Sequence, residues 1–237
     1  MNATTVTVEL PPRLDSWTCK ILYGARTYGA GDVIIVDFND QDSTMIIQAQ
    51  CDLTGTVVTS TKPVAVFSSI NRKSFQMSTA RSVMQLPPVT TWGKQHVAFK
   101  TPGTGPSRMI DIWKIVTLNA TTVNLFHSDT QQVETININE RNCYTITLRS
   151  EKWVEIASNQ PVMVMQILMS QDEWTPQDAI IHTPVEQFKT RMMMSRYLLW
   201  PHNLTMAVVR KQNNAAGPLQ VNDAPTTTGK KKNQQNS

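Results

Sequence analysis

Residues 58–66 read VTSTKPVAV, and residues 156–164 read IASNQPVMV. Both stretches run through an aliphatic residue, a small or Thr residue, Ser, two polar residues and Pro, and end in two Val residues at alternate positions. Proline is accepted at the first residue of a strand, because its missing N–H costs little there. The pattern therefore predicts strands that begin at Pro63 and at Pro161. We expect the valines after each proline to be buried: Val64, Val66, Val162 and Val164.

A second pair of similar segments precedes the first pair in the same order. ATTVTV at 3–8 matches ATTVNL at 120–125. An apolar segment lies between the two anchors of each copy: GDVIIVDF at 31–38 and CYTITL at 143–148. Repeated order of this kind is the mark of an internal duplication. We predict two related β units, at 3–69 and 120–167.

Alternation of apolar and polar residues runs through most of the chain. Tyr144, Ile146 and Leu148, for example, alternate with Thr and Arg. This period of two indicates strands with one buried face. The expected fold is all-β, with two related antiparallel β-sandwich or jelly-roll-like units packed together. We place one domain at 1–207. Residues 208–237 are expected to hold the start of a further strand segment and a disordered basic tail.

The formal charge of +4 is concentrated at the end of the chain. Residues 208–237 hold five basic side chains against Asp223, so the rest of the chain is neutral. A neutral body argues against a nucleic-acid partner, because such affinity comes mainly from Lys and Arg matched to phosphates. The run of lysines near the end is interpreted as part of a solvated tail.

The cysteines and the first residues bear on the compartment. The chain has three cysteines, and Cys19 with Cys51 is a candidate disulfide, while three unpaired thiols are the alternative. Cys143 is the third. The start of this chain has no basic segment followed by an apolar one, so it shows no signal peptide. No uncharged stretch is long and apolar enough to predict a membrane span.

Catalytic, cofactor and metal motifs are not found in the sequence. It contains no nucleophile elbow, phosphate loop or dinucleotide fingerprint. Its histidines are widely spaced and give no metal-ligand pattern. We therefore assign no catalytic, cofactor-binding or metal-binding residues, and expect no cofactor.

Two kinds of surface residue are candidates for recognition. Trp92 follows Pro87 and Pro88, and it is either an exposed anchor for a partner or a ring packed over the two prolines. Three N-x-[ST] sequons predict glycosylation, with Asn119 the best placed because it precedes a predicted strand. The candidate acceptors are Asn119, Asn203 and Asn2.

Several of these segments together resemble the N-terminal domain of IgG Fc-binding proteins. The resemblance covers roughly residues 20–210, and its motifs follow the order of that family. They are DLTGTVV at 52–58, KPVAVFSS at 62–69, QLPPVTTWGKQHVAF at 85–99, IWKIVTLNATTVNL at 112–125, SNQPVMVMQI at 158–167 and TPVEQFKTRMMMSRY at 183–197. The chain departs from the family where Ser68 and Ser69 replace the usual Ser-Gly, and where Ser78, Thr79 and Ala80 replace Cys and acidic residues.

The resemblance implies a non-enzymatic, extracellular binding or adhesion module. Such domains occur in mucin-like mucosal proteins and in secreted or surface proteins of invertebrates, so it also implies a larger multidomain protein and a protein or glycoprotein ligand. Antibody binding is a property of only some members. Two alternatives stay open: a carbohydrate-active enzyme on a β scaffold, which would need two facing carboxylates, and an intracellular β protein.

Overall fold

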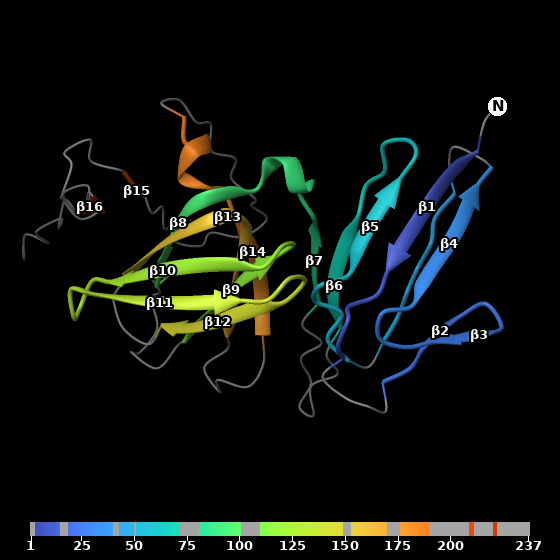
Figure 1. The fold of residues 1–237 in the computed structure, drawn as a ribbon, viewed down its shortest axis with the longest axis horizontal. Helices are drawn as coiled ribbons and strands as arrows, with labels where there is room; N and C mark the ends of the chain where they lie inside the picture. The colour runs from blue at the N-terminus through green and yellow to red at the C-terminus, as the bar shows by residue number, and fades with distance from the viewer. Residues whose placement is uncertain are drawn as a thin grey trace, which may run out of the picture. The chain divides into compact units, whose positions relative to one another are not determined.

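The computed structural model is built almost entirely of strands (Figure 1). It describes residues 3–14, 19–39, 43–49, 51–71, 81–100, 110–148, 153–169, 176–189, 209–210 and 220–221. Within these ranges there is no α-helix, and the helical turns are two short 3₁₀ segments, η1 (Val89–Thr91) and η2 (Val185–Gln187). The expected all-β class is confirmed. No helix in the described part of the chain is long and apolar enough to cross a membrane.

The first sheet is small and antiparallel. Its order is β4 (Val33–Phe38), β1 (Thr4–Glu9) and β5 (Val57–Ser60). Alternate residues of β1 are buried, as the sequence pattern predicts, and they pack with Ile34 of β4. A two-stranded ribbon, β2 (Ile21–Tyr23) and β3 (Arg26–Tyr28), contributes Ile21 to the same core.

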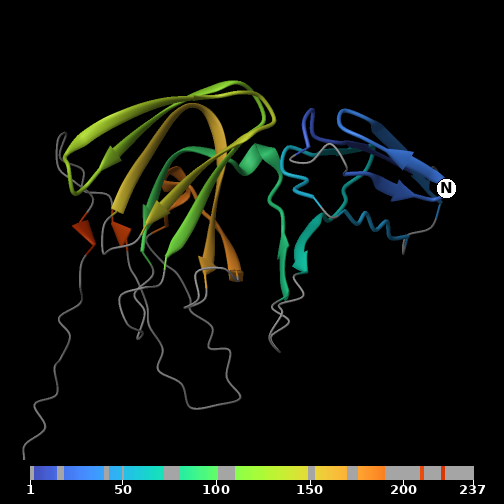
Figure 2. The ribbon, with the colours of Figure 1, turned by 90° about the horizontal axis from the view of Figure 1, so that it is seen from below.

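The second sheet has seven strands arranged around one long strand, β13 (Trp153–Met169). The first half of β13 pairs with β10 (Thr121–His127) and β8 (Gly93–Phe99), and its second half pairs with β9 (Asp111–Thr117) and β14 (Pro176–His182). β11 (Gln132–Ile138) extends the sheet beside β10, and β12 (Cys143–Leu148) extends it beside β9. Because β13 changes partners along its length and bends, the sheet folds over on itself (Figure 2).

The main core lies between the two halves of this folded sheet. Trp113 and Ile115 from β9 pack with Val154 and Ile156 from the first half of β13, and all four are almost fully buried. Val162 follows the bend of β13 and is also fully buried. A sandwich core of this kind results from alternation, since every second residue of each strand points inward.

A hairpin of β6 (Phe67–Asn71) and β7 (Arg81–Gln85) packs against the other face of the second half. Met84 of β7 contacts a cluster that includes Ile167 and Met169 of β13 and Ala179 of β14. The hairpin ends at Gln85, so it delivers the following Pro87–Trp92 stretch to the end of the folded sheet. This placement matters for the site below.

The two segments that resemble each other in sequence pair in the same register. Val6 of β1 lies opposite Ser60, and Val123 of β10 lies opposite Ser158. The side-chain contacts repeat as well. In each copy the Ser hydroxyl donates to a carbonyl two residues on, at 2.7 Å. The backbone N–H of Thr5 donates to Thr61 Oγ1, and that of Thr122 donates to Asn159 Oδ1, both at 3.0 Å.

The third strand of the second copy differs from the expectation. We expected CYTITL at 143–148 to be the counterpart of β4, but β10 pairs with β11 instead. Thr5 donates to Asp37 of β4, and Thr122 donates in the same way to Asn137 of β11. The turn between β10 and β11 is short, so β10 pairs with the strand that follows it directly in the sequence. The more distant segment at 143–148 forms β12 instead.

The strands expected to begin at the two prolines also differ. Residues 61–66 form no strand, and β6 begins only at Phe67, so Val64 is 39% exposed and Val66 half-buried. Pro161 lies inside β13, at the register shift where pairing with β8 is interrupted. A proline is tolerated at such an irregularity because no ladder hydrogen bond needs its N–H. Val162 and Val164 after it are fully buried, as predicted.

Residues 101–104 and 193–237 form a unit separate from the rest of the chain. Of this unit the structure describes only a two-stranded pair, β15 (Val209–Arg210) and β16 (Gln220–Val221). The rest of the expected basic tail lies outside the described residues. The domain boundaries near 207, and the outer limits of the two repeat units, remain predictions.

Candidate ligand pocket around Trp92

Trp92 is among the residues that line a pocket of about 220 Å³ at one end of the folded sheet. The indole is half-buried, so neither alternative drawn from the sequence describes it fully. Five segments meet here: the end of β7, η1 with Trp92, the start of β8, the bend of β13 and the end of β14 with η2. The lining side chains are Gln85, Pro87, Thr91, Trp92, His96, Val162, Met163, Ile181, His182, Thr183, Pro184 and Gln187.

Two similar proline turns form the wall of this pocket. η1 follows Pro88 and η2 follows Pro184, and both prolines have extended backbone that leads into the turn. The η2 turn is tied to β8 because Glu186 Oε1 accepts hydrogen bonds from the N–H groups of Lys94 (2.8 Å) and Gln95 (3.0 Å). Gln187 Nε2 donates to the carbonyl of Thr91 in the first turn. The sequence Pro-Val-x-x occurs at both turns, and this shared pattern could have indicated from the sequence that the two turns are related.

Gly93 allows the two turns to approach each other. It is buried, and a Cβ atom at this position would lie 2.2 Å from Cβ of Pro184. Only a residue without a side chain fits such a close approach. The Trp-Gly pair at 92–93 therefore has a structural cause in the packing of η2 against β8.

Two histidines, distant in sequence, are brought together behind Trp92. His96 in β8 is 1% exposed, and His182 ends β14 with its ring 4.4 Å from that of Trp113. Burial, and to a smaller extent the charge of His96, lower the pKa of His182 to about 4. Burial also lowers the pKa of His96, against smaller opposing effects from the backbone of Gly93 and Val162 and the charge of Glu186. Both rings are therefore neutral at physiological pH.

A buried hydrogen-bond chain fixes the orientation of His182. Its Nε2–H donates to Oε1 of Gln166 at 2.9 Å, and Gln166 Nε2 donates to Oδ2 of Asp111 at 2.8 Å. Because an amide oxygen only accepts, the proton of His182 must lie on Nε2. The carboxylate of Asp111 thus orients the amide of Gln166, and the amide in turn orients the imidazole of His182. This chain holds a side chain in place and differs from the direct His–carboxylate contact of catalytic triads.

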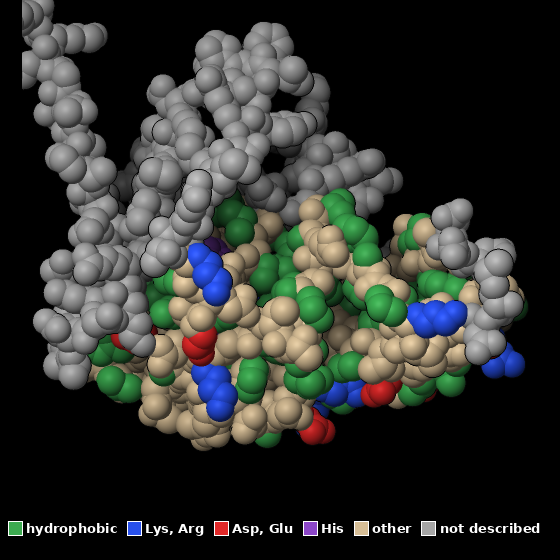
Figure 3. Space-filling view, turned by 90° about the horizontal axis from the view of Figure 1, so that it is seen from above, with side chains coloured by type: hydrophobic (Ala, Val, Ile, Leu, Met, Phe, Trp, Pro, Cys, Tyr) green, Lys and Arg blue, Asp and Glu red, His purple; other side chains and the backbone are tan. Residues whose placement is uncertain are grey.

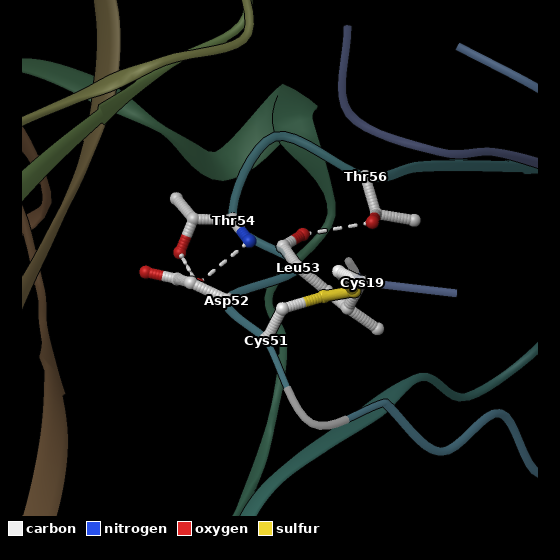
Figure 4. Close-up of a disulfide and its surroundings, with 6 residues drawn as sticks. All are labelled: Cys19, Cys51, Asp52, Leu53, Thr54 and Thr56. Atoms are coloured by element: carbon white, nitrogen blue, oxygen red, sulfur yellow. Dashed lines mark hydrogen bonds between the residues drawn. A yellow bond between two sulfur atoms is a disulfide. The ribbon is translucent and has the colours of Figure 1, made fainter. Parts of the chain in front are cut away.

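The other candidate residues lie elsewhere. Cys19 and Cys51 form a disulfide beside the loop that begins the first family motif, DLTGTVV at 52–58 (Figure 4). In that loop Asp52 Oδ1 accepts from the N–H and the hydroxyl of Thr54, at 2.9 and 2.6 Å. Cys143 is a free, half-buried thiol whose pKa is raised by burial. A shallow pocket of about 370 Å³ lies next to Cys19.

Asn119 is exposed in the turn between β9 and β10, where its carbonyl accepts from the Thr121 hydroxyl at 2.6 Å. Its side chain is therefore accessible for a glycan. Asn2 and Asn203 lie outside the described residues. Among the described residues no group of three or more His, Cys, Asp or Glu could hold a metal ion.

Comparisons with known proteins give one match over the entire chain. The profile of the family described as "IgGFc binding protein" matches residues 1–237. No curated protein matches the chain. Among solved structures, a crystal structure of the serine-rich repeat protein Srr2 from Streptococcus agalactiae is similar at 10% identity, covering 81% of this chain and 84% of that one with a TM-score of 0.18.

Proposed function

Because the chain belongs to the IgGFc binding protein family, we propose that it is an extracellular, non-enzymatic module that binds a protein or glycoprotein. The observation that carries the proposal is this membership over the whole chain. It supports binding over glycoside hydrolysis, and an extracellular role over an intracellular one. We further propose that the module works in mucus, matrix or at the cell surface as part of a larger protein.

The cysteine chemistry supports a place outside the cell. The Cys19–Cys51 disulfide closes a loop that contains the β2–β3 ribbon and β4 of the first sheet, and disulfides persist mainly in oxidising compartments. The exposed Asn119 sequon is consistent with passage through the secretory pathway.

The surface supports a protein or glycoprotein partner over a nucleic acid. On the face shown in Figure 3, Lys and Arg side chains are scattered singly among apolar and uncharged polar residues. Large apolar side chains are exposed on the strands, among them Leu22, Ile35 and Phe67. Apolar and aromatic groups of this kind are typical of contact surfaces between proteins.

Binding to an immunoglobulin Fc fragment and to a purified mucin tests the proposal. The chain, produced in a secretory host, would be immobilised and exposed to each probe, with the Fab fragment as the matched control for Fc. Saturable binding of Fc or mucin is the expected result. Hydrolysis of chromogenic glycosides by the purified chain, with no binding of either probe, would overturn the proposal in favour of the enzyme alternative.

A further inference from the structure

The strand β5 forms one edge of the first sheet within the described part of the chain. It pairs with β1 on one side, and no other described strand pairs with it (Figure 1). Its residues change from half-buried to exposed along the strand, and residues 61–65 after it are exposed as well. The outer side of β5 is therefore not covered by another described strand.

The counterpart of β5 in the second copy of the repeat lies inside a sheet. The segments 58–66 and 156–164 correspond in sequence, so β5 corresponds to the first half of β13. This half lies between β10, the counterpart of β1, and β8. There Ile156 lies opposite His96 of β8, and both side chains are almost fully buried. The second copy thus shows that an antiparallel strand fits beside this segment.

The register of β1 and β5 shows which backbone groups of β5 face outward. The N–H of Thr61 donates to the carbonyl of Thr5 at 3.0 Å, so this pair is hydrogen-bonded. Hydrogen-bonded pairs alternate with pairs that are not bonded along an antiparallel ladder. Thr59 therefore also bonds to β1, whereas Val58 and Ser60 direct their N–H and C=O groups to the outer side. Each of these groups requires a hydrogen-bond partner, which is water or another chain.

The side chains of β5 favour an uncharged partner strand. Val58 lies opposite the buried Val8 and packs against the core of the first sheet, so a residue added opposite Val58 would also face inward. The four residues of β5, VVTS, carry no charge, and the next charged residue, Lys62, lies beyond the end of the strand. Edge strands that stay unpaired are commonly protected by charged side chains. β5 lacks this protection.

We propose that β5 binds an extended segment of the protein partner as an added antiparallel strand, in the place that β8 takes in the second copy. The N–H and C=O of Val58 exchange two hydrogen bonds with one residue of that segment. Ser60 is placed to contact the same backbone, because its counterpart Ser158 lies with Oγ 3.2 Å from the Lys94 carbonyl oxygen in β8. Main-chain hydrogen bonds give such a complex its affinity, and the inward side chains select the sequence. This inference rests on the proposed function, because it names how the module holds its partner.

Amide hydrogen exchange, followed by nuclear magnetic resonance of the ¹⁵N-labelled full chain, tests the inference. The probe is an acetylated and amidated peptide with the sequence of residues 93–99, since this strand fits the equivalent edge. The matched control is the same peptide with an N-methyl group on the backbone nitrogen of its histidine. That group removes the donor to the Val58 carbonyl and needs no change in the protein.

Saturable slowing of exchange at the amides of Val58 and Ser60 is the expected result. The amide of Thr59 should not change, because it already bonds to β1. The N-methylated peptide should bind about two- to tenfold more weakly, the effect of one net hydrogen bond. Amides of β11, at the edge of the second sheet, report non-specific binding.

Two results of this experiment would overturn the inference. Unchanged exchange at Val58 with saturating peptide would show that β5 accepts no added strand. Slower exchange at Val58 as the protein concentration rises without peptide, together with a dimer in analytical ultracentrifugation, would identify a second copy of the chain as the occupant of this edge.

A protein variant separates this inference from the proposed function. Val58→Pro removes the outward N–H but no hydrogen bond to β1, and proline is tolerated on edge strands. It should weaken the peptide about two- to tenfold, whereas Val58→Thr, which keeps the N–H, should not. If Val58→Pro binds the Fc fragment or mucin as tightly as the original chain, β5 does not hold the partner, although the module still binds. If no protein probe binds while the peptide still protects Val58, the proposed function fails and the strand site stands.

Discussion

At the scale of single residues, the histidines behind Trp92 show how burial sets protonation. His182 contacts Trp113 and Phe99 and donates to Gln166, so its ring is enclosed by aromatic and amide groups. Its pKa of about 4 lies well below the ordinary value of 6.5. The folded protein therefore resists taking up a proton that the unfolded chain accepts readily.

We expect this histidine to make stability depend on pH. Above pH 6.5 both the folded and the unfolded chain hold His182 neutral, and its contribution is constant. As the pH falls from 6.5 to 4, only the unfolded chain is protonated, so the free energy of unfolding should fall by roughly 3 kcal/mol for this group. Urea unfolding at pH 7.5, 5.5 and 4.5 measures the loss.

His182→Gln should flatten this pH dependence, since glutamine does not titrate in that range. His127→Gln is the matched control, because His127 lies partly exposed beside Glu134 at 3.2 Å. An unchanged slope in His182→Gln would show that burial of this ring does not control the acid response.

The sequence alone could not reveal these residues as a site. His96, His182 and Trp92 lie in separate motifs and form no spaced pattern. They meet because β13 pairs with both β8 and β14, and that pairing depends on a bend which no local signal specifies. The part that could be found is Trp92 itself, since a Trp next to Gly after two prolines is distinctive.

At the scale of elements, alternation predicted which faces are buried but not which strands pair. β1 and β10 each pair with the segment of the second repeated motif in the same register, because short, similar motifs specify a local register. The repeat assigned β12 where β11 belongs, since both are apolar alternating strands and only the hairpin distinguishes them. It also misjudged Val64, because the similar residues directly after the proline belong to a strand only in the second copy.

This divergence between the copies gives a sharp test of core packing. Val162→Ala removes two methyl groups from a fully buried side chain, at ~0.8 kcal/mol per buried carbon, so we expect a loss of roughly 1.5 kcal/mol before any cavity effect. Val64→Ala, the equivalent position in the first copy, should cost less than about 0.5 kcal/mol because Val64 is exposed. Urea unfolding of both variants measures the difference. Equal losses would contradict the different burial of the two copies.

At the scale of the whole molecule, few contacts in the described residues connect the first sheet to the second. Lys114 of β9 forms an ion pair with Asp52 at 2.9 Å. Arg141, in the turn before β12, reaches the end of β1 and the loop before β5. Gly55 lies so close to Arg141 that a Cβ atom there would be 2.2 Å from the Arg141 carbonyl oxygen. The junction is thus polar and closely packed.

The first sheet also depends on its disulfide. The bridge between Cys19 and Cys51 spans 32 residues, and closing a loop of that length stabilises a domain by about 4 kcal/mol in the chain-entropy description. Reduction, or the Cys19→Ser and Cys51→Ser pair, should lower the melting temperature clearly, whereas Cys143→Ser should change it little. Calorimetry with and without reductant measures this. A melting temperature insensitive to reductant would argue against an oxidised, extracellular form.

Arg141 should be the residue on which the junction depends most. Its guanidinium donates to the carbonyls of Gly55, Glu9 and Leu10 and pairs with the Glu9 carboxylate at 3.3 Å. Removing it leaves several half-buried carbonyl groups without a donor, so Arg141→Ala should lower the free energy of unfolding by about 2–3 kcal/mol.

Arg141→Lys should recover little of that lost stability. The single ammonium group of lysine cannot reproduce the planar guanidinium, whose several N–H groups reach carbonyls of β1 and of the loop before β5 at the same time. Arg13→Ala, at an exposed position of the same charge, should cost less than about 0.5 kcal/mol. Urea unfolding followed by tryptophan fluorescence compares the three variants. If Arg141→Ala were as stable as Arg13→Ala, the two sheets would be held together by apolar contact alone, and the polar junction would contribute nothing measurable.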